Sequence, residues 1–269
     1  MGRLEGKVAF VTGAARGQGR AHCVRLAAEG ADIIAVDICR GFSTVNTKPA
    51  TPEDLEETVR LVEKQGKRIV ASQTDVRDLD ALQAAFDAGL AELGRIDVVV
   101  ANAGILNCGW SWELTPQQWQ EVIDVNLTGV FNTAKVATPA MIRQGQGGSI
   151  IMTSSTAGLF GQPFTANYTA AKHGVVGLAR CLANELAEFS IRVNTIHPTG
   201  VDTDMMVIPE LLDLINSRAE TLGPVFMNSL PTEKVQPEDI AATVAYLASD
   251  DAKYVTGGQL RVDAGKLNR

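Results

Sequence analysis

The sequence predicts one α/β domain built on a doubly wound parallel sheet of the Rossmann type, with about seven strands and helices on both faces. Short apolar runs alternate with longer amphipathic stretches along the whole chain of 269 residues. Several of these runs lack polar alternation, as expected for strands buried on both faces. No repeat, charge block or Ser/Gly-rich linker divides the chain, so we expect a single domain over residues 1–269.

Each apolar run is expected to form one strand of the sheet. The expected strands, in chain order, are Val8–Thr12, Asp32–Asp37, Arg68–Thr74, Val98–Ala101, Gly148–Thr153, Arg192–His197 and Gln259–Val262. The helical patterns between them lie at about 17–29, 53–65, 79–93, 116–145, 164–188, 206–220 and 237–248. Strands joined through helices are expected to run parallel, because a right-handed crossover returns the chain to the same end of the sheet.

Two segments depart from the regular alternation. Residues 39–52, CRGFSTVNTKPATP, insert polar and turn-forming residues between the second strand and the next helix. Residues 199–231 lie between the sixth strand and the last helix and are rich in Met and aliphatic side chains. Loops carried on a rigid scaffold are where binding residues concentrate, so we expect specificity to depend on these two segments.

The composition is ordinary for a soluble globular protein, with 45% hydrophobic and 20% charged residues. The net charge of −7 disfavours a nucleic acid or an anionic membrane as the main partner. No run approaches the ~18 apolar residues of a membrane span, and no signal-peptide core precedes the first strand. The four cysteines are scattered and do not cluster with the three histidines, so we expect a reduced, cytoplasmic protein without a metal site.

A glycine-rich loop, Thr12–Gly19, follows the first expected strand and opens the next helix. Gly13, Gly17 and Gly19 give it the pattern G-x-x-x-G-x-G. Such a loop lets the backbone approach a pyrophosphate, while the helix N-terminus supplies N–H donors and positive potential. Three glycines alone are also typical of a tight strand-to-helix turn, but the place directly after the first strand favours a phosphate site.

The choice of dinucleotide depends on two residues that act in opposite directions. Asp37 ends the second expected strand, about 20 residues after the loop, where a carboxylate accepts hydrogen bonds from the adenosine ribose and repels a 2′-phosphate. Arg16, within the loop, would instead accommodate that phosphate. We favour NAD(H), because the repulsion by Asp37 is a direct penalty, whereas Arg16 can serve the pyrophosphate or solvent equally well.

A tyrosine, a lysine and a serine have the spacing of an acid–base site. Tyr168 and Lys172 are four residues apart, so on a helix both side chains leave the same face. A free tyrosine has a pKa of about 10, and a neighbouring cation is expected to lower it, which makes Tyr168 a candidate general acid/base. Ser155 lies thirteen residues upstream. A surface Tyr and a solvated Lys would show the same spacing, so the interpretation depends on the other motifs.

Together these motifs resemble the short-chain dehydrogenase/reductase family, over about residues 6–265. The family's T-G-x-x-x-G-x-G loop matches Thr12–Gly19, and its Y-x-x-x-K motif matches Tyr168 to Lys172. The distance to the tyrosine assigns the family's serine to Ser155 and not to Ser154. Further positions that match family elements are Asp75, Val76, Asn102, Ala103, Gly104, Asn126, Pro198, Val201 and Thr203. The usual Pro-Gly is here Pro198-Thr199-Gly200, a departure that affects the loop over the nicotinamide.

The resemblance implies a role for each residue. Ser155 hydrogen-bonds the substrate oxygen, Tyr168 exchanges the hydroxyl proton, and Lys172 lowers the tyrosine pKa and holds the nicotinamide ribose. Asn126 is expected to keep a water near Lys172. The residues expected to contact NAD(H) are Gly13, Arg16, Gly17, Gln18, Gly19, Asp37, Ile38, Asp75, Val76, Asn102, Ala103, Gly104, Tyr168, Lys172, Pro198, Val201 and Thr203.

The run from Gly30 to Cys39 and the insertion after it resemble a narrower branch, the actinobacterial carveol-dehydrogenase-type or mycofactocin-coupled enzymes. That resemblance implies firmly held NAD and an external electron acceptor. A loop folded over the adenosine end would slow cofactor release. An exposed, variable loop is the alternative interpretation. Family members commonly form homotetramers, here through helices 116–145 and 164–188 and the strand Gln259–Val262.

The expected substrate is an apolar secondary alcohol or ketone, such as a carveol-like terpenol. Candidate pocket residues are Met205, Met206, Val207, Ile208, Leu211, Leu212, Leu214, Val225, Phe226 and Met227, with Trp110 and Phe160 as further candidates. The spacing at 208, 211, 212 and 215 equally fits a helix that buries one face. Two other functions stay open: an NADPH-dependent carbonyl or 3-oxoacyl-thioester reductase, and a non-catalytic nucleotide-sensing scaffold, which the retained Ser, Tyr and Lys disfavour.

Overall fold

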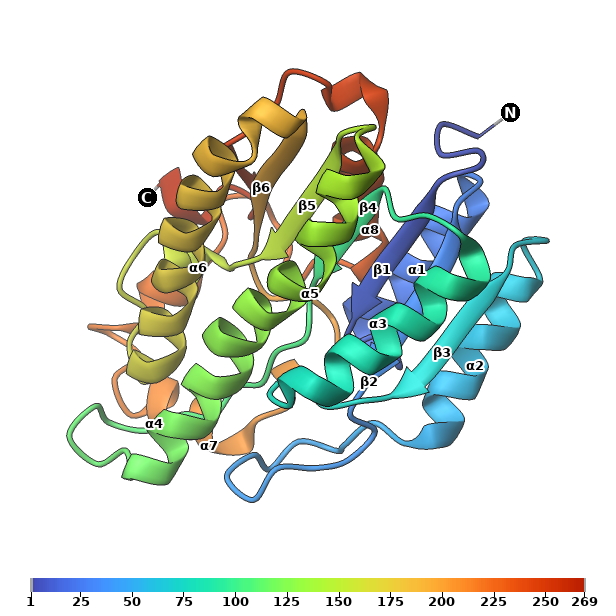
Figure 1. The fold of residues 1–269 in the computed structure, drawn as a ribbon. Helices are drawn as coiled ribbons and strands as arrows, with labels where there is room; N and C mark the ends of the chain where they lie inside the picture. The colour runs from blue at the N-terminus through green and yellow to red at the C-terminus, as the bar shows by residue number, and fades with distance from the viewer. Residues whose placement is uncertain (1, 269) are drawn as a thin grey trace.

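The computed structural model describes residues 2–268 and places seven parallel strands in one sheet (Figure 1). The strands are β1 (Val8–Thr12), β2 (Asp32–Asp37), β3 (Ile69–Gln73), β4 (Val98–Ala101), β5 (Gly148–Thr153), β6 (Ile191–Pro198) and β7 (Gln259–Val262). Their order in the sheet is β3-β2-β1-β4-β5-β6-β7. The order reverses between β1 and β4, which places a crevice at the carboxyl ends of these strands, where doubly wound folds bind ligands. The expected fold class is confirmed.

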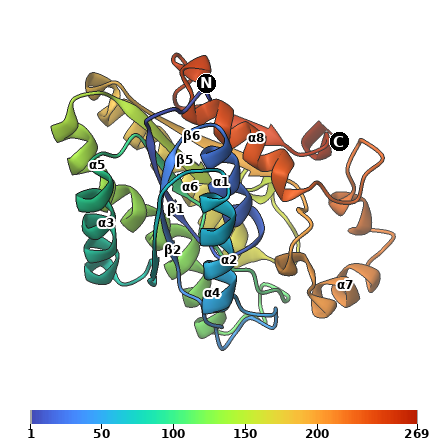
Figure 2. The same cartoon turned by 90° about the vertical axis from the view of Figure 1, so that its right-hand side faces the viewer.

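Helices cover both faces of this sheet (Figure 2). They are α1 (Gly17–Ala28), α2 (Pro52–Glu63), α3 (Leu79–Leu93), α4 (Pro116–Ile123), α5 (Gly129–Gln144), α6 (Ala166–Glu185), α7 (Pro209–Asn216) and α8 (Pro237–Ala248). Helices α1, α2 and α8 pack on one face, and α3, α5 and α6 pack on the other. No helix within residues 2–268 is long and apolar enough to cross a membrane.

The central strands supply apolar side chains to both layers. Every residue of β1 and β4 is buried. Phe10 and Val99 pack in the core under α3, α5 and α6, whereas Val11 and Val100 pack in the core under α1, α2 and α8. Because successive strand residues point to opposite faces, a strand covered on both sides must be apolar throughout. This explains the runs without polar alternation in the sequence.

The helix expected over 116–145 is interrupted by a π-helical turn at Asp124–Thr128. Within this turn the N–H of Gly129 donates to the carbonyl of Asp124, five residues earlier. The chain thus stays helical from Pro116 to Gln144, close to the expected bounds, with a π turn in its middle. Asn126 lies in this turn, and its fully buried side chain hydrogen-bonds the backbone of Ile105. Such π turns often mark functional sites.

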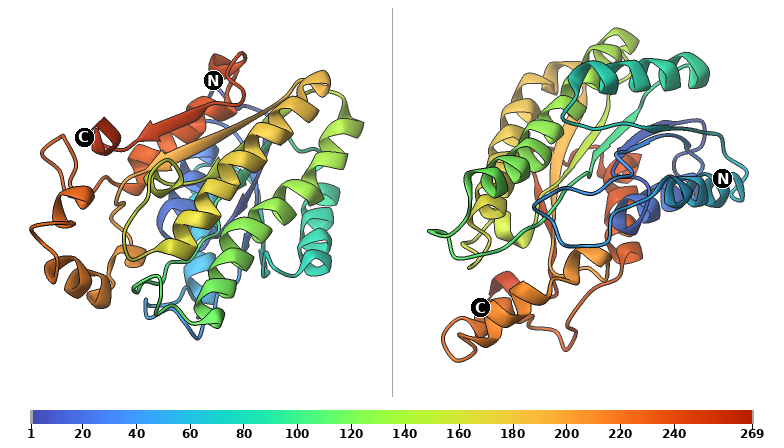
Figure 3. Two further views of the ribbon diagram at one scale, coloured as in Figure 1. Left: turned by 90° about the vertical axis from the view of Figure 1, so that its left-hand side faces the viewer. Right: turned by 90° about the horizontal axis from the view of Figure 1, so that it is seen from below.

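The two irregular segments lie together at the carboxyl edge of the sheet (Figure 1). The 39–52 loop reaches α4, where Ser43 and Thr44 donate hydrogen bonds to Glu121 at 3.0 and 2.5 Å. It also reaches α7, where Asn46 donates to Glu210 at 2.9 Å. The 199–231 segment stands out from the sheet, as Figure 3 shows in orange. Its expected helix at 206–220 is shorter and begins at Pro209, a residue suited to the first helical turn.

Candidate active site

The glycine loop is held against the loop that follows β4. The Asn102 side chain donates to the Thr12 carbonyl at 3.1 Å, and the Thr12 hydroxyl accepts from the N–H groups of Asn102 and Ala103. Gly13 has φ +67°, and a Cβ there would lie 2.8 Å from the Cα of Ala103. A side chain at position 13 would therefore both strain the backbone and separate the two loops.

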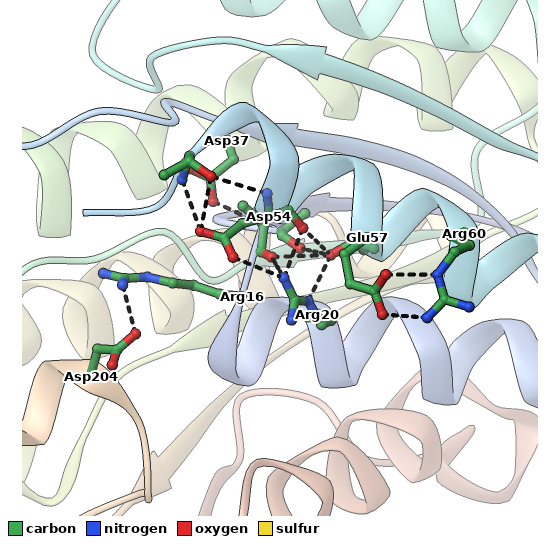
Figure 4. A network of polar contacts seen from close by, with 11 residues as sticks. Arg16, Arg20, Asp37, Asp54, Glu57, Arg60 and Asp204 are labelled. Atoms are coloured by element: carbon green, nitrogen blue, oxygen red, sulfur yellow. Dashed lines mark hydrogen bonds and ion pairs between the residues drawn. The ribbon is translucent and has the colours of Figure 1, made fainter. Parts of the chain in front are cut away.

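A polar network fixes the outer side of the glycine loop (Figure 4). Arg20 donates to the carbonyls of Ala15 and Asp54 at 2.5 and 2.8 Å. The buried Thr58 hydroxyl donates to the Ala14 carbonyl at 2.9 Å. These bonds connect the start of α1 to α2 and fix the position of the loop. Pre-organised backbone N–H groups are what an anion site at a helix N-terminus requires.

A cavity of about 570 Å³ opens between these elements. Most of the expected cofactor residues line it: Gly13, Arg16, Gly17, Gln18, Gly19, Asp37, Ile38, Asp75, Val76, Asn102, Ala103, Gly104 and Thr203. Tyr168, Lys172, Pro198 and Val201 do not appear among its lining residues. Gln18 lines the cavity, and its buried Oε1 atom has no hydrogen-bond partner within residues 2–268. The cavity, this unpaired acceptor and the glycine cradle fit a dinucleotide.

Asp37, the residue expected to bind the adenosine ribose, lines this cavity and is 7% exposed. Its Oδ2 accepts from the N–H of Ala15 at 3.0 Å, and its Oδ1 accepts from the N–H of Cys39 at 2.9 Å. The carboxylate is therefore held in place by two backbone donors. Each oxygen keeps further acceptor capacity, which suits ribose hydroxyl groups.

Asp75 also lines the cavity, and it forms ion pairs with two arginines. Arg77 lies 2.7 Å and Arg40 lies 3.2 Å from its Oδ2. Burial raises the pKa of the Asp75 carboxyl, but hydrogen bonds and charge from these arginines outweigh burial and hold the pKa below its usual value. Asp75 is thus an ionised acceptor at this wall of the cavity.

Lys172 is buried beneath the site, with 2% of its surface exposed. Its Nζ donates to the backbone carbonyl of Thr153 at 2.7 Å and lies 5.4 Å from the centre of the Tyr168 ring. Burial lowers the pKa of Lys172 to about 7. Both residues extend from α6, as their spacing predicted, and the lysine changes charge near neutral pH.

The pKa of Tyr168 differs from the sequence-based expectation. Burial raises it to about 12, and a hydrogen bond with Ser155 acts in the opposite direction. The expected lowering by Lys172 is not found: the lysine is itself desolvated, and its Nζ donates to the Thr153 carbonyl. Tyr168 is therefore protonated at neutral pH.

The two neighbouring serines have different environments. Ser155 is partly exposed, its Oγ accepts from the Ala157 N–H at 3.1 Å, and its hydroxyl acts to lower the pKa of Tyr168. Ser154 is buried, and its Oγ donates to the Lys172 carbonyl at 3.0 Å. Ser155 thus stays partly accessible, while Ser154 braces the helix that carries Tyr168 and Lys172.

Gly104 joins the cavity to the acid–base cluster. A Cβ at this position would lie 2.7 Å from Oδ1 of Asn126 and 3.7 Å from Nζ of Lys172. The Asn126 amide accepts from the N–H of Ile105 at 2.9 Å and donates to its carbonyl at 2.8 Å. Asn126 therefore fixes the backbone next to Gly104, and the glycine leaves room for the lysine to approach the cavity.

His197 is a site residue that the sequence motifs did not identify. Its Nδ1 lies 2.7 Å from the Ser155 carbonyl, and its Nε2 lies 2.7 Å from Oγ1 of Thr195. Burial lowers the pKa of His197 to about 4, so the ring is neutral. We assign the proton to Nδ1, which donates to Ser155. The position directly before Pro198 is the signal that could have located it.

An apolar cluster of side chains packs against Tyr168. It is formed by Leu106, Phe164, Ile208 and Leu211, with Trp110, Met205, Leu214, Ile215, Leu222 and Phe226 packed against it. Met205 and Leu106 also line the cavity, so this cluster connects the cavity to the tyrosine. Phe160 instead lines a separate hollow near Arg261 and Lys266. Trp110 is thus near the tyrosine and Phe160 is not part of this cluster.

This combination of fold and site defines a nucleotide-dependent oxidoreductase. A family model for short chain dehydrogenases matches residues 7–208. The chain belongs to the short-chain dehydrogenase family.

Individual relatives are similar over their full length. The (−)-trans-carveol dehydrogenase of Rhodococcus erythropolis is 44% identical, over 98% of this chain and 99% of the relative. The crystal structure of carveol dehydrogenase from Mycobacterium avium in complex with NAD has a TM-score of 0.95 and 47% identity, over 100% of both chains. A short chain dehydrogenase from Mycobacterium paratuberculosis bound to NAD has a TM-score of 0.97 and 50% identity, also over 100% of both chains.

Proposed function

We propose that this protein transfers a hydride between NAD(H) and an apolar secondary alcohol or its ketone. The observation that carries the proposal is the cluster of Ser155, Tyr168 and Lys172 next to Gly104, which lines the dinucleotide-sized cavity. Solved relatives at 47% and 50% identity hold NAD, which supports the same cofactor here.

The residues divide the chemistry between them. Bound NAD supplies the hydride acceptor, and the glycine loop, Asp37 and Lys172 would hold it. Ser155 donates a hydrogen bond to the substrate oxygen, which becomes negative as its proton leaves in alcohol oxidation and as hydride adds to the carbonyl carbon in ketone reduction. Tyr168 gives a proton to this oxygen in ketone reduction and takes it in alcohol oxidation. Its raised pKa suits the first direction. The phenolate needed for the second would be favoured by cationic Lys172 once its Nζ turns from the Thr153 carbonyl toward the tyrosine.

The charges around the cavity favour NAD(H) over NADP(H). The cationic residues that line it are Arg16, Arg20, Arg40 and Lys48. Each arginine is paired with an aspartate, at 2.7 Å to Asp204, 3.5 Å to Asp54 and 3.2 Å to Asp75, respectively. A 2′-phosphate would have to compete with these carboxylates and with Asp37. The NADPH-dependent reductase is therefore the less favoured function.

A carveol-like terpenol is the substrate class that we place first. A relative and a solved neighbour are carveol dehydrogenases by name. The apolar cluster beside Tyr168 offers Met205 and aliphatic groups from α7, which suit a small hydrocarbon ring better than a charged thioester.

The 39–52 insertion acts as a lid that slows NAD release. It lines the cavity and is anchored on one side at Glu121 in α4 and on the other at Glu210 in α7. The guanidinium of Arg77 lies 4.7 Å from the centre of the Phe42 ring, which adds a further contact to the loop. Firmly held cofactor needs an external electron acceptor, and a mycofactocin-type carrier is the one that we propose.

We also propose a cytoplasmic homotetramer that assembles through α5, α6 and β7. Phe131 in α5 is 44% exposed, and burial of such a side chain favours association. Light scattering on a size-exclusion column would give the molecular mass, and Phe131→Glu is expected to weaken assembly. A monomeric wild-type protein would contradict this proposal.

Mass spectrometry under native and then denaturing conditions tests the function and the lid together. NAD(H) that survives purification and appears only on denaturation would support the lid and direct assays toward artificial electron acceptors with apolar alcohols. An empty protein that reduces added NAD with carveol would support the dehydrogenase without the lid. A protein that holds no NAD(H), and that oxidises secondary alcohols neither with added NAD nor with an artificial electron acceptor, would contradict the proposed function.

A further inference from the structure

Arg16 reaches from the glycine loop to the 199–231 segment (Figure 4). Its Nη1 lies 2.7 Å from Oδ2 of Asp204, the first residue of the short turn that follows Thr203. The methyl group of Thr203 would lie 3.1 Å from a Cβ on Gly17, so the two segments are close together here. The ion pair therefore connects two segments that line the same cavity.

The backbone of Arg16 is next to the adenosine end of the cavity. Its neighbour Ala15 donates an N–H to Asp37 at 3.0 Å. A long side chain at position 16 can thus extend toward Asp37, where a 2′-phosphate would be placed, or toward Asp204. The structure has it at Asp204. A guanidinium binds carboxylate and phosphate groups through the same N–H geometry, so the two anions compete for it.

We infer that Asp204 is a specificity-determining residue for the dinucleotide, because it holds Arg16 and withholds its guanidinium from a 2′-phosphate. The inference rests on the proposed function, since it concerns the choice between NAD(H) and NADP(H) in the same cavity. Asp37 disfavours NADP(H) because it repels the 2′-phosphate. Asp204 disfavours NADP(H) because it holds the Arg16 guanidinium that would otherwise attract this phosphate. Specificity commonly combines both devices.

The pairing of Arg16 differs from that of the other arginines at the cavity. The partner of Arg20 is Asp54 in α2, and the partner of Arg40 is Asp75 after β3. Those pairs stay on the side of the cavity formed by β1 to β3, whereas Asp204 belongs to the 199–231 segment. Dinucleotide choice in this protein therefore depends on where the 199–231 segment lies.

The test measures dissociation constants of NADH and NADPH for the full-length protein freed of retained cofactor. Asp204→Asn removes the charge that holds Arg16 and is expected to lower the NADPH-to-NADH ratio of dissociation constants about three- to tenfold. Adding Arg16→Gln to that variant is expected to restore the wild-type ratio, because the freed guanidinium is then missing. Asp204→Ala should act in the same direction as Asp204→Asn.

Asp202→Asn is the matched control. Asp202 also lines the cavity and pairs with Lys234 at 3.2 Å, and its side chain is 52% exposed against 50% for Asp204. Both substitutions remove one negative charge near the cavity, but Asp202→Asn leaves Arg16 paired and should change the ratio less than twofold. An unchanged ratio in Asp204→Asn, or an equal change in Asp202→Asn, would overturn the inference. A wild-type protein that binds neither dinucleotide would overturn the proposed function instead.

Discussion

Ser154 and Lys172 are joined by a hydrogen bond from the serine hydroxyl to the lysine backbone carbonyl, at 3.0 Å. Gly158 makes this contact possible, because a Cβ there would lie 2.8 Å from the same carbonyl oxygen. The bond fixes the turn of α6 from which the lysine side chain reaches Thr153. Two consecutive serines thus differ: Ser154 positions the helix, and Ser155 is the one that we propose to bind the substrate oxygen.

Replacing each serine by alanine should separate these tasks. Ser155→Ala removes the donor to the developing charge on the substrate oxygen, so we expect kcat to fall by about 10²- to 10³-fold. The melting temperature should change little, because Ser155 is partly exposed. Ser154→Ala should instead lower the free energy of unfolding by about 1 kcal/mol with a smaller loss of kcat. Equal effects of the two substitutions on kcat would argue against Ser155 as the catalytic serine.

The buried lysine makes stability depend on pH. Folding lowers the pKa of Lys172 from 10.5 to about 7, so between these values the unfolded chain binds more protons than the folded one. The free energy of unfolding should therefore rise with pH across this window. The pKa of Tyr168 is raised from 10 to about 12, which gives the opposite slope above pH 10.

Lys172→Met should remove the first of these slopes. The variant is expected to gain stability relative to the wild type near pH 7 and to lose this advantage as the pH approaches 10, since neutral lysine is no longer penalised there. Thermal unfolding of the cofactor-free proteins across this range measures the difference. Activity should fall by at least about 10²-fold at every pH, because the acid–base pair is incomplete. A constant stability difference across the range would contradict the assigned pKa.

The sequence was most informative where one interaction determines the structure. Buried parallel strands must be apolar on both faces, so their positions and the fold class followed from the hydrophobic pattern. The cavity lining around Gly13, Asp37 and Gly104 followed from motifs with fixed spacing. The homotetramer, the lid and the substrate remain predictions.

Features that depend on contacts between distant segments could not be read from the pattern. The π turn contains Asn126, whose amide bonds Ile105, 21 residues earlier. Arg16 and Asp204 are 188 residues apart in the sequence, so the periodicity of individual helices cannot predict their ion pair. The pKa of Tyr168 is raised because the whole fold buries its side chain, and the four-residue spacing to Lys172 cannot predict this burial.

Asn126 should have a catalytic role beyond its structural one, and Asn194 provides the comparison. Both amides are fully buried and bridge backbone groups: Asn126 bonds Ile105 twice, and Asn194 bonds Val255 and Gly258 at 2.7 and 2.9 Å. Alanine at either position should cost about 2–5 kcal/mol of stability, because two buried groups lose partners.

The two variants should differ in activity when measured well below their melting temperatures. Asn126→Ala is expected to lower kcat by at least tenfold, because Gly104 and Lys172 adjoin its amide, whereas Asn194→Ala should retain kcat close to the wild type. The measurement is kcat per folded molecule, with the folded fraction from circular dichroism. Equal losses of kcat in the two variants would show that Asn126 has only a structural role.

Glu121 should control how long NAD stays bound, because it anchors the 39–52 loop to α4. Burial raises its pKa, but hydrogen bonds from Thr44, Ser43 and Gln117 outweigh burial and keep the carboxyl ionised as a strong acceptor. Glu121→Ala removes this acceptor, and we expect NAD to dissociate about tenfold faster, as the loss of one charge-assisted bond would produce. Stopped-flow displacement of bound NADH measures the rate.

Glu57→Ala is the control, since it breaks a carboxylate–arginine pair with Arg60 on the exposed face of α2 and should leave the rate unchanged. If Glu121→Ala leaves the rate unchanged too, the loop is an exposed insertion and not a lid.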